Sequence, residues 1–222
     1  ILARHGSQGD GLLAGALLLK EGRRLRFILK KQLLSDPCLD VVGHRIPNYF
    51  VDRDSLDNKD ELTNIGLLAR DMADDEALII FPEGTRFSTE KLAKAISALS
   101  ETAPTRVKSA SELRSVLPPR TAGTLAALAE SNADIVICNH VGISDISSLQ
   151  QLRAAVPLQT QLKFKLWRTP RSEVNQTQFV QWLDAQWAIV DDWVTNNEDV
   201  TSPLSTPASF NADETATTIE KA

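Results

Sequence analysis

The chain has 222 residues, of which 42% are hydrophobic and 24% are charged, and its formal net charge at pH 7 is -5. A globular chain of this length buries about 70% of the surface that it exposes when unfolded, and the sequence has no basic tract of the kind that binds nucleic acid. Its two cysteines, Cys38 and Cys138, lack the spacing of a metal site or a disulfide framework, so we expect no metal and a reducing, cytosol-facing compartment.

The beginning of the chain predicts a strand, a loop and a helix. Residues 1–3 have the composition of a strand end, and the apolar stretch at 11–19 predicts a helix that begins at Asp10. His5 is therefore expected in a strand-to-helix loop. The apolar stretch is shorter than the roughly 20 residues that span a bilayer, and because the chain begins with Ile1 rather than methionine, we expect residues to be missing upstream.

Strands and helices alternate along the next part of the chain. Strands are predicted over 24–30, 48–53 and 77–81, the last of them continuously apolar and therefore buried. A helix is predicted over 60–75 because apolar residues recur there at helical spacing. That stripe consists of Leu62, Ile65, Leu68 and Met72.

The same alternation continues to the C-terminal region. Helices are predicted over 88–101, 121–131 and 179–194, with a buried strand over 134–138. The apolar stripes are Leu92, Ile96 and Leu99 in the first of these helices and Phe179, Leu183, Trp187 and Val190 in the last. This order predicts an α/β fold with a mixed, mostly parallel sheet flanked by helices. From Thr195 onward polar and acidic residues dominate, which predicts disorder.

His5 and Asp10 form the first candidate site. The HxxxxD spacing can bring a carboxylate to one ring nitrogen, fix the tautomer and make the other nitrogen a better proton acceptor. A histidine near an acid in a loop is also common without any catalytic role. From these two residues alone, both interpretations remain open.

The segment FPEGTR at residues 81–86 forms the second candidate site. It follows the buried strand directly, and Gly84 permits a tight turn with outward N–H groups. Thr85 adds a hydroxyl and Arg86 a planar fork suited to phosphate oxygens. Glu83 could hold the arginine or accept a hydrogen bond from a substrate hydroxyl, and the alternative is a purely structural Glu–Arg pair.

Arg53 is the third candidate, at the end of the predicted strand 48–53. Open α/β sheets place ligands at the carboxyl ends of their strands, so Arg53 could contact an anionic ligand there. An arginine at a strand end is usually only solvated. Arg53 is a candidate mainly because the other candidate residues accompany it in the sequence.

These motifs together resemble the lysophospholipid acyltransferases, the 1-acylglycerol-3-phosphate acyltransferase family. HxxxxD at His5 to Asp10, the FVDR strand that ends at Arg53 and FPEGTR at 81–86 look like the first three motif blocks of that family, in the family's order. LPPRTAG at 117–123 and the Trp-rich segment after residue 170 are similar to its long-chain branch. The sequence departs from the family pattern at Arg4, where an asparagine is usual, and the segment 133–143 matches the fourth block loosely.

The resemblance implies a glycerol-3-phosphate acyltransferase-like fold and an acyltransferase domain over 1–195, with a C-terminal helical extension from about residue 170 and a disordered acidic tail over 196–222. The implied reaction moves a fatty acyl group from an acyl thioester to the free hydroxyl of a lysophospholipid such as 1-acylglycerol 3-phosphate. The thioester, acyl-CoA or an acyl carrier, is a co-substrate, and no cofactor is implied.

The resemblance also implies roles for the candidate residues. His5 acts as the general base and Asp10 orients it, while N–H groups of the 6–9 loop could stabilise the oxyanion. The substrate-binding residues that it implies are Arg53, Glu83, Gly84, Thr85 and Arg86.

Both implied substrates are amphiphiles, so we expect the protein to work at a membrane surface, on the cytoplasmic face. The apolar helix after Asp10 and the tryptophans Trp182, Trp187 and Trp193 could contact lipid, although helical spacing of apolar residues first indicates core packing. The sequence predicts no particular oligomeric state.

Two alternatives compete with this interpretation. Arg4-His5-Gly6 also resembles the Arg-His-Gly motif of the histidine phosphatases, in which His5 would be the nucleophile, His140 a second histidine, Arg53 a phosphate ligand and Glu83 the acid. That hypothesis leaves FPEGTR and LPPRTAG unexplained, whereas the acyltransferase hypothesis explains them and treats His140 as a bystander. An inactive scaffold would need a broken motif, and every motif residue is present.

Overall fold

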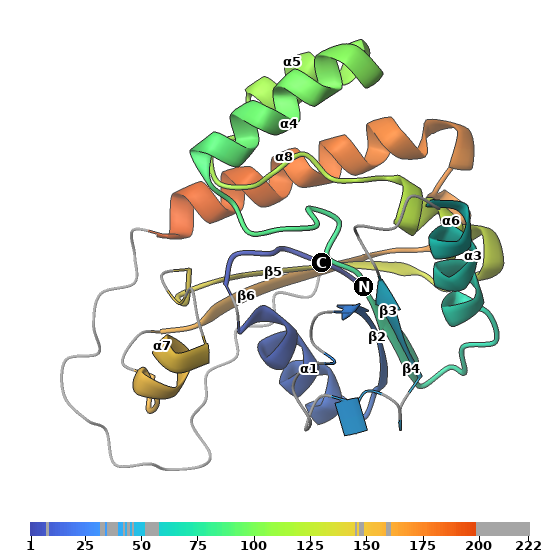
Figure 1. Cartoon of the computed structure of the whole chain (residues 1–222), viewed down its shortest axis with the longest axis vertical. Helices are drawn as coiled ribbons and strands as arrows, with labels where there is room; N and C mark the ends of the chain where they lie inside the picture. The colour runs from blue at the N-terminus through green and yellow to red at the C-terminus, as the bar shows by residue number, and fades with distance from the viewer. Residues whose placement is uncertain are drawn as a thin grey trace.

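A computed structural model describes residues 1–7, 9–31, 34, 40–41, 43, 45, 47–51, 58–144, 146, 149–158 and 161–198. Six strands form its sheet (Figure 1). The strands are β1 Leu2–Ala3, β2 Arg24–Lys30, β3 Asn48–Val51, β4 Glu76–Ile79, β5 Ile135–Val141 and β6 Lys163–Thr169. The predicted strand over 48–53 is described only as far as Val51, so Arg53 lies outside the described residues.

The strands form two three-stranded ladders that adjoin at the chain's first residues. The ladders have the orders β3-β2-β4 and β1-β5-β6. The N–H of Ala3 donates to the Ile80 oxygen and the N–H of Ile80 donates to the Ile1 oxygen, both at 2.9 Å, so β1 lies between β5 and the end of β4. Among the strand pairs that the structure describes, β5–β6 is antiparallel and the others are parallel. The predicted mixed, mostly parallel sheet is thus confirmed.

Five of the described helices lie where the sequence predicts them, whereas α5 and α7 were not predicted. Their bounds are α1 Asp10–Lys20, α3 Asn58–Ala69, α4 Thr89–Thr102, α5 Val107–Ser111, α6 Ala122–Glu130, α7 Leu149–Ala154 and α8 Phe179–Glu198, with short 3-10 turns at Pro104–Arg106, Arg171–Glu173 and Gln176–Gln178. Ser88 caps α4 by accepting a hydrogen bond from the Lys91 N–H. The helix predicted over 60–75 ends at Ala69, shortly before Asp71, which has a positive φ.

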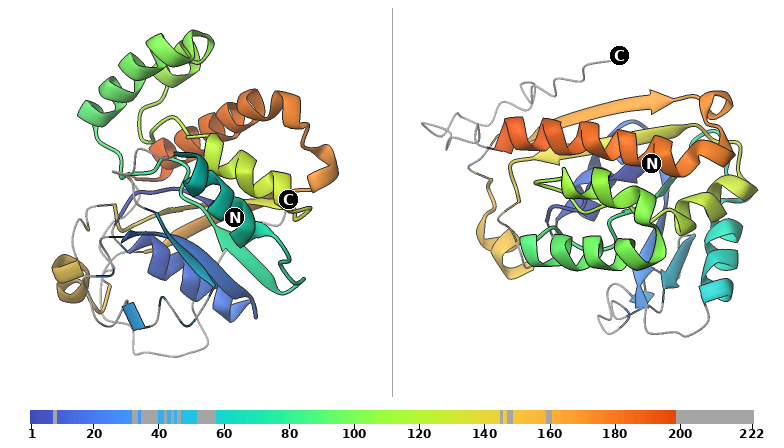
Figure 2. Two further views of the ribbon diagram at one scale, coloured as in Figure 1. Left: turned by 45° about the vertical axis from the view of Figure 1, so that its right-hand side comes forward. Right: turned by 90° about the horizontal axis from the view of Figure 1, so that it is seen from above.

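Helix α8 covers one face of the sheet and buries the predicted stripe. Phe179, Leu183, Trp187 and Val190 are all fully buried, and they pack on Ile137 and Val141 of β5. Trp182 and Trp193 are partly buried against the same cluster. The core packing predicted for this helix is therefore observed. Helices α4 and α5 lie beyond α8, on the side of the sheet away from α1 (Figures 1 and 2).

Helix α1 covers the opposite face of the sheet. Ala14 and Leu18 pack there against Ala3, Ile79 and Cys138, because successive residues of a strand point to opposite faces. The helix is only half covered, and Leu12 and Leu19 are exposed. Among the described helices, none has both the length and the apolar character needed to cross a membrane.

Helix α8 extends beyond the boundary that composition indicated. It continues as a helix through Glu198, three residues past the predicted end of the folded domain at 195. The rest of the predicted acidic tail, 199–222, lies outside the described residues. These last residues of α8 include Glu198, which contacts Arg4 next to His5.

Candidate active site

His5 and Asp10 lie at the carboxyl end of β1, where the chain turns into α1. The His5 Nδ1 atom is 2.9 Å from Asp10 Oδ2. The N–H of Ser7 donates to both Asp10 oxygens, at 2.9 Å and 2.8 Å, and thereby fixes the carboxylate. The Asp10 side chain is 1% exposed and that of His5 is 21% exposed. Nδ1 therefore faces the carboxylate, and Nε2 is left for a substrate.

His140 is a second histidine against the same carboxylate. Its Nε2 lies 3.1 Å from Asp10 Oδ1, and its side chain is 2% exposed. The register of β1 and β5 pairs Ala3 with Cys138, so residues that follow Cys138 lie beside the His5 loop. The hypothesis that His140 is a bystander at a strand end did not include this contact with the acid of the HxxxxD motif.

The environment of Asp10 favours its charged form. Burial by itself would raise the pKa of this carboxyl, but its contacts with His140, His5 and the Ser7 N–H outweigh that effect and hold the pKa well below its ordinary value. Asp10 is thus a carboxylate at neutral pH. A fixed negative charge beside Nδ1 is what a histidine needs in order to accept a proton at Nε2.

Glu83 is a buried residue of the FPEGTR segment that contacts the HxxxxD loop. Its Oε1 accepts a hydrogen bond from the His5 N–H at 2.8 Å and its Oε2 accepts one from the Leu117 N–H at 2.9 Å. The residue is 2% exposed. Burial raises its pKa to about 8. These contacts make Glu83 a structural link between the His5 loop, the FPEGTR turn and the segment 117–120, and its role in substrate binding stays a prediction.

Glu83 should make the stability of the protein depend on pH in a specific window. Its native pKa of about 8 lies above the ordinary value of 4.5, so between these values the unfolded state releases a proton that the native state keeps. The free energy of unfolding therefore falls as pH rises through this window. We expect the unfolding free energy of the wild type minus that of Glu83→Gln to decrease from about pH 5 to about pH 8, measured by urea unfolding. A difference that stays constant or grows would contradict the assignment.

The FPEGTR turn is closed by basic side chains. Gly84 has φ of +71°, a conformation that favours glycine, and the guanidinium of Arg120 packs closely over it, since a Cβ there would lie 3.2 Å from the guanidinium carbon. The Lys91 ammonium donates to Thr85 Oγ1 at 3.1 Å and to the Arg86 main-chain oxygen at 3.0 Å. Thr85 therefore has a cation beside its hydroxyl, and Arg120 covers the glycine.

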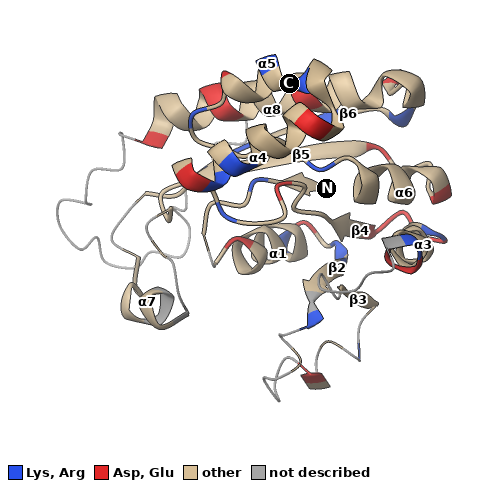
Figure 3. Cartoon of the chain, turned by 45° about the horizontal axis from the view of Figure 1, so that its top comes forward, with Lys and Arg blue, Asp and Glu red and all other residues tan. Residues whose placement is uncertain are grey.

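A cavity of about 500 Å³ opens beside this turn, between α4 and the segment 117–120. Its basic lining residues are Lys91, Lys94, Arg106 and Arg120. Its apolar lining comes from Ala95, Ala98 and Leu99 of α4 and from Leu117, Pro118 and Pro119. The lysines lie in the first half of α4 (Figure 3). Such a lining suits a ligand that has both an anionic group and an apolar part.

The structure places the predicted substrate residues differently with respect to this cavity. Glu83 and Thr85 line it, whereas Gly84 and Arg86 are not among the described lining residues, and Arg53 lies outside the described residues. Arg120 and Lys94 were not predicted from the sequence as site residues. LPPRTAG is a motif of the sequence, but only the fold brings its arginine against Gly84.

The N–H groups of the 6–9 loop are partly used within the loop. The N–H of Ser7 donates to Asp10, and that of Gly9 donates to Ser7 Oγ at 2.8 Å. The expectation that this whole loop supplies oxyanion donors is therefore too broad. Among the described loop residues, the N–H of Gly6 is the remaining candidate.

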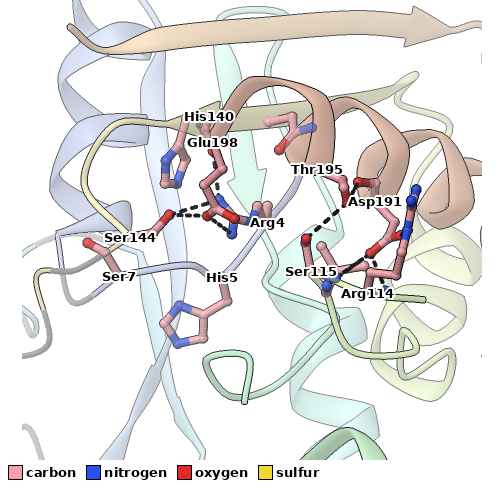
Figure 4. A network of polar contacts seen from close by, with 12 residues as sticks. Arg4, His5, Ser7, Arg114, Ser115, His140, Ser144, Asp191, Thr195 and Glu198 are labelled. Atoms are coloured by element: carbon pink, nitrogen blue, oxygen red, sulfur yellow. Dashed lines mark hydrogen bonds and ion pairs between the residues drawn. The ribbon is translucent and has the colours of Figure 1, made fainter. Parts of the chain in front are cut away.

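Arg4 anchors the His5 loop to the end of α8 (Figure 4). Its guanidinium donates to the His140 main-chain oxygen at 2.9 Å and to Glu198 Oε1 at 3.0 Å, and Ser144 Oγ donates to the same Glu198 oxygen at 2.6 Å. Arg4 is 3% exposed. The histidine phosphatase hypothesis needs Arg4 and His140 at a phosphate, but both side chains are buried and engaged with protein groups.

Asp191 of α8 anchors the segment that leads to LPPR (Figure 4). Its Oδ1 accepts hydrogen bonds from the N–H groups of Arg114, Ser115 and Val116, at 2.9 Å, 2.6 Å and 3.2 Å. Because Leu117 follows directly and donates to Glu83, this carboxylate indirectly supports the His5 loop. Neither Asp191 nor Glu198 was identified from the sequence, since buried acids carry no local pattern.

The described part of the chain contains no group of three or more His, Cys, Asp or Glu side chains arranged to hold a metal ion.

A protein-family model described as Acyltransferase matches residues 1–121, which include His5, Asp10 and FPEGTR and make up more than half of the 222 residues. Comparisons with curated proteins and with solved structures found no match.

Proposed function

Because this chain belongs to the acyltransferase family, the 1-acylglycerol-3-phosphate acyltransferase-like proteins, we propose that it acylates a lysophospholipid. The donor is an acyl thioester such as acyl-CoA, the acceptor is a lysophospholipid such as 1-acylglycerol 3-phosphate, and the product is then phosphatidic acid. The observation that carries the proposal is the His5–Asp10 pair next to the FPEGTR turn. Nδ1 of His5 lies 2.9 Å from the buried carboxylate, which leaves Nε2 as the ring nitrogen that can face a substrate.

The proposed chemistry begins at the acceptor hydroxyl. His5 Nε2 takes the hydroxyl proton while the alcohol oxygen attacks the thioester carbonyl, and Asp10 stabilises the charge that the ring gains. The tetrahedral intermediate then breaks its carbon–sulfur bond. The thiol has a pKa of about 8.5, so it can leave as a thiolate and then recover the proton from His5. No covalent acyl-enzyme is needed, and the Gly6 N–H is a candidate donor to the oxyanion.

The cavity supports a place for the acceptor's phosphate and the apolar part next to it. Lys91 and Arg120 bring positive charge to the turn, and a guanidinium can bind phosphate oxygens in a bidentate manner. In this proposal Arg86 and Arg53 complete the phosphate site, as the family resemblance implies. The apolar wall of α4, which includes Leu99 of the predicted stripe, then contacts the glycerol and acyl portions.

Arg86→Ala should mainly weaken the use of the phosphate-bearing acceptor. Loss of a charge-assisted hydrogen bond costs about 1.5 to 3 kcal/mol, so we expect KM for 1-acylglycerol 3-phosphate to rise by about 10- to 100-fold with the KM for the thioester little changed. Steady-state kinetics with each substrate varied in turn measures this. Arg70→Ala is the matched control, because Arg70 is exposed and paired with Glu130. A change confined to thioester binding would contradict this division of the site.

Because its proposed substrates are amphiphiles, we propose that the protein acts at a membrane surface. In this proposal the surface is the cytoplasmic face. The exposed Leu12 and Leu19 on α1, the helix that begins at Asp10, support this proposal. Sedimentation with lipid vesicles measures it directly. Equal recovery in the supernatant with and without vesicles would contradict it.

A thiol-release assay with a panel of acyl donors and lysolipid acceptors tests the function itself. We expect thiol release to depend on the acceptor. Thiol release at the same rate without any lysolipid would mean that the protein is a thioesterase and would contradict the proposal.

A further inference from the structure

The buried ring of His140 is the strongest feature that the proposed mechanism does not yet use. It is 1% exposed as a residue. Its surroundings are Asp10 of α1 at 3.1 Å from Nε2, the Phe164 ring of β6 at 6.1 Å between centroids, and Arg4, whose guanidinium binds the His140 main-chain oxygen. Neither of its ring nitrogens makes a hydrogen bond of good geometry among the described residues, although Nε2 lies within 3.1 Å of Asp10 Oδ1. Among the described residues, the polar group closest to the ring nitrogens is thus the carboxylate that orients His5.

Asp10 is held from two sides by two imidazoles. Oδ2 faces His5 Nδ1 at 2.9 Å, Oδ1 faces His140 Nε2 at 3.1 Å, and the Ser7 N–H bridges both oxygens. The His140 contact is close, but it does not meet the geometry of a hydrogen bond. A nitrogen this near a carboxylate oxygen must carry a hydrogen, because two lone pairs would repel each other. The arrangement therefore favours the tautomer of His140 that has its hydrogen on Nε2.

We propose that His140 is a positioning residue for acyl transfer. With its hydrogen on Nε2, it holds Asp10 from the side opposite to His5 and prevents the carboxylate from turning away. Asp10 can then keep the His5 ring in the orientation that presents Nε2 to the acceptor hydroxyl. The kinetic part of this inference rests on the proposed function. The contact itself belongs to the fold and can be tested without activity.

Two substitutions of similar volume separate positioning from packing. His140→Leu removes the N–H donor, and we expect kcat to fall by about 10- to 100-fold, as for other groups that orient a reacting residue, with the KM of both substrates nearly unchanged. His140→Gln can place an amide N–H near the same point, and we expect it to recover much of the lost kcat. Equal kcat in the two variants would overturn the inference.

A matched control accounts for any loss of stability. Val141→Ala changes the next residue of β5, which is fully buried but packs toward α8 on the other face of the sheet. We expect it to lower the free energy of unfolding without a comparable fall in kcat. If Val141→Ala lowers kcat as much as His140→Leu does, the role of His140 is only structural.

A double substitution tests whether His140 acts through Asp10. In an Asp10→Ala background the oxygen that faces the His140 N–H is absent, so adding His140→Leu should change kcat by no more than about twofold. The full effect of His140→Leu in that background would overturn the inference. Unfolding curves for each variant identify any that do not fold.

Nitrogen-15 NMR of histidine-labelled protein tests the contact without any measurement of activity. The chain has three histidines, and His140→Gln assigns the signal of His140 by its loss. We expect a protonated Nε2 in His140, and an unprotonated Nε2 would overturn the inference whether or not the protein transfers acyl groups. If transfer is absent but Nε2 is protonated, the proposed function fails and the His140–Asp10 contact stands. If transfer is present and His140→Leu has full activity, only the positioning role fails.

Discussion

His5→Ala should abolish acyl transfer, lowering kcat by about 10²- to 10⁴-fold. The physical reason is that an alcohol is a poor nucleophile until its proton is removed, and His5 Nε2 is the proton acceptor that the buried Asp10 carboxylate supports at 2.9 Å through Nδ1. The loss should appear in kcat rather than in KM, since the base acts as the hydroxyl proton leaves. Thiol release and formation of the acylated lipid, measured together, check the prediction.

The control for His5→Ala is stability. The His5 side chain is partly exposed, and its main-chain N–H, which donates to Glu83, remains in the variant. We therefore expect the unfolding curve to stay close to that of the wild type. Acyl transfer by His5→Ala at nearly the wild-type rate would refute the assignment of the base.

Asp191→Ala should have the largest effect on stability. Its Oδ1 accepts hydrogen bonds from three consecutive N–H groups, those of Arg114, Ser115 and Val116, and the residue is 3% exposed. A buried donor left without a partner costs about 1 to 3 kcal/mol, so we expect the free energy of unfolding to fall by about 3 kcal/mol or more. The segment 114–120 would also lose its anchor, which should weaken the Leu117–Glu83 hydrogen bond and thereby lower activity.

Two variants make the Asp191 prediction specific. Asp191→Asn keeps one carbonyl acceptor and should lose less stability than Asp191→Ala. Asp192→Ala changes the next residue, whose side chain is 70% exposed, and should lie within about 0.5 kcal/mol of the wild type. Urea unfolding gives all three values. If Asp191→Ala is as stable as Asp192→Ala, then this network does not hold the segment.

The sheet and helices were largely predictable because apolar spacing reports which face of an element is buried. The stripe of α8 is fully buried, as its period indicates. The stripe of α4 has the same period, but none of its residues is buried, and part of it lines the cavity instead. Spacing shows that a face is apolar and leaves open whether protein or a ligand covers it.

The site was predictable where its parts are close in sequence. The HxxxxD spacing places His5 and Asp10 on one turn, and their contact follows from local geometry. The contact of His140 with Asp10 was missed because it depends on the parallel pairing of β1 with β5. These two strands lie far apart in the sequence, and Ala3 pairs with Cys138. A signal was present, since both strands end at the same edge of the sheet and His140 lies near the end of its strand. The buried acids Asp191 and Glu198 act through tertiary contacts that no spacing predicts.

The most direct test is a single-turnover reaction in which the purified protein meets acyl-CoA and 1-acylglycerol 3-phosphate, and both products are quantified. We predict one free thiol for each acylated lipid in the wild type, neither product in His5→Ala, and no phosphate on His5. Thiol without acylated lipid, or a phosphohistidine at His5 after incubation with a phosphate ester, would contradict the proposed role of His5 as the base in acyl transfer.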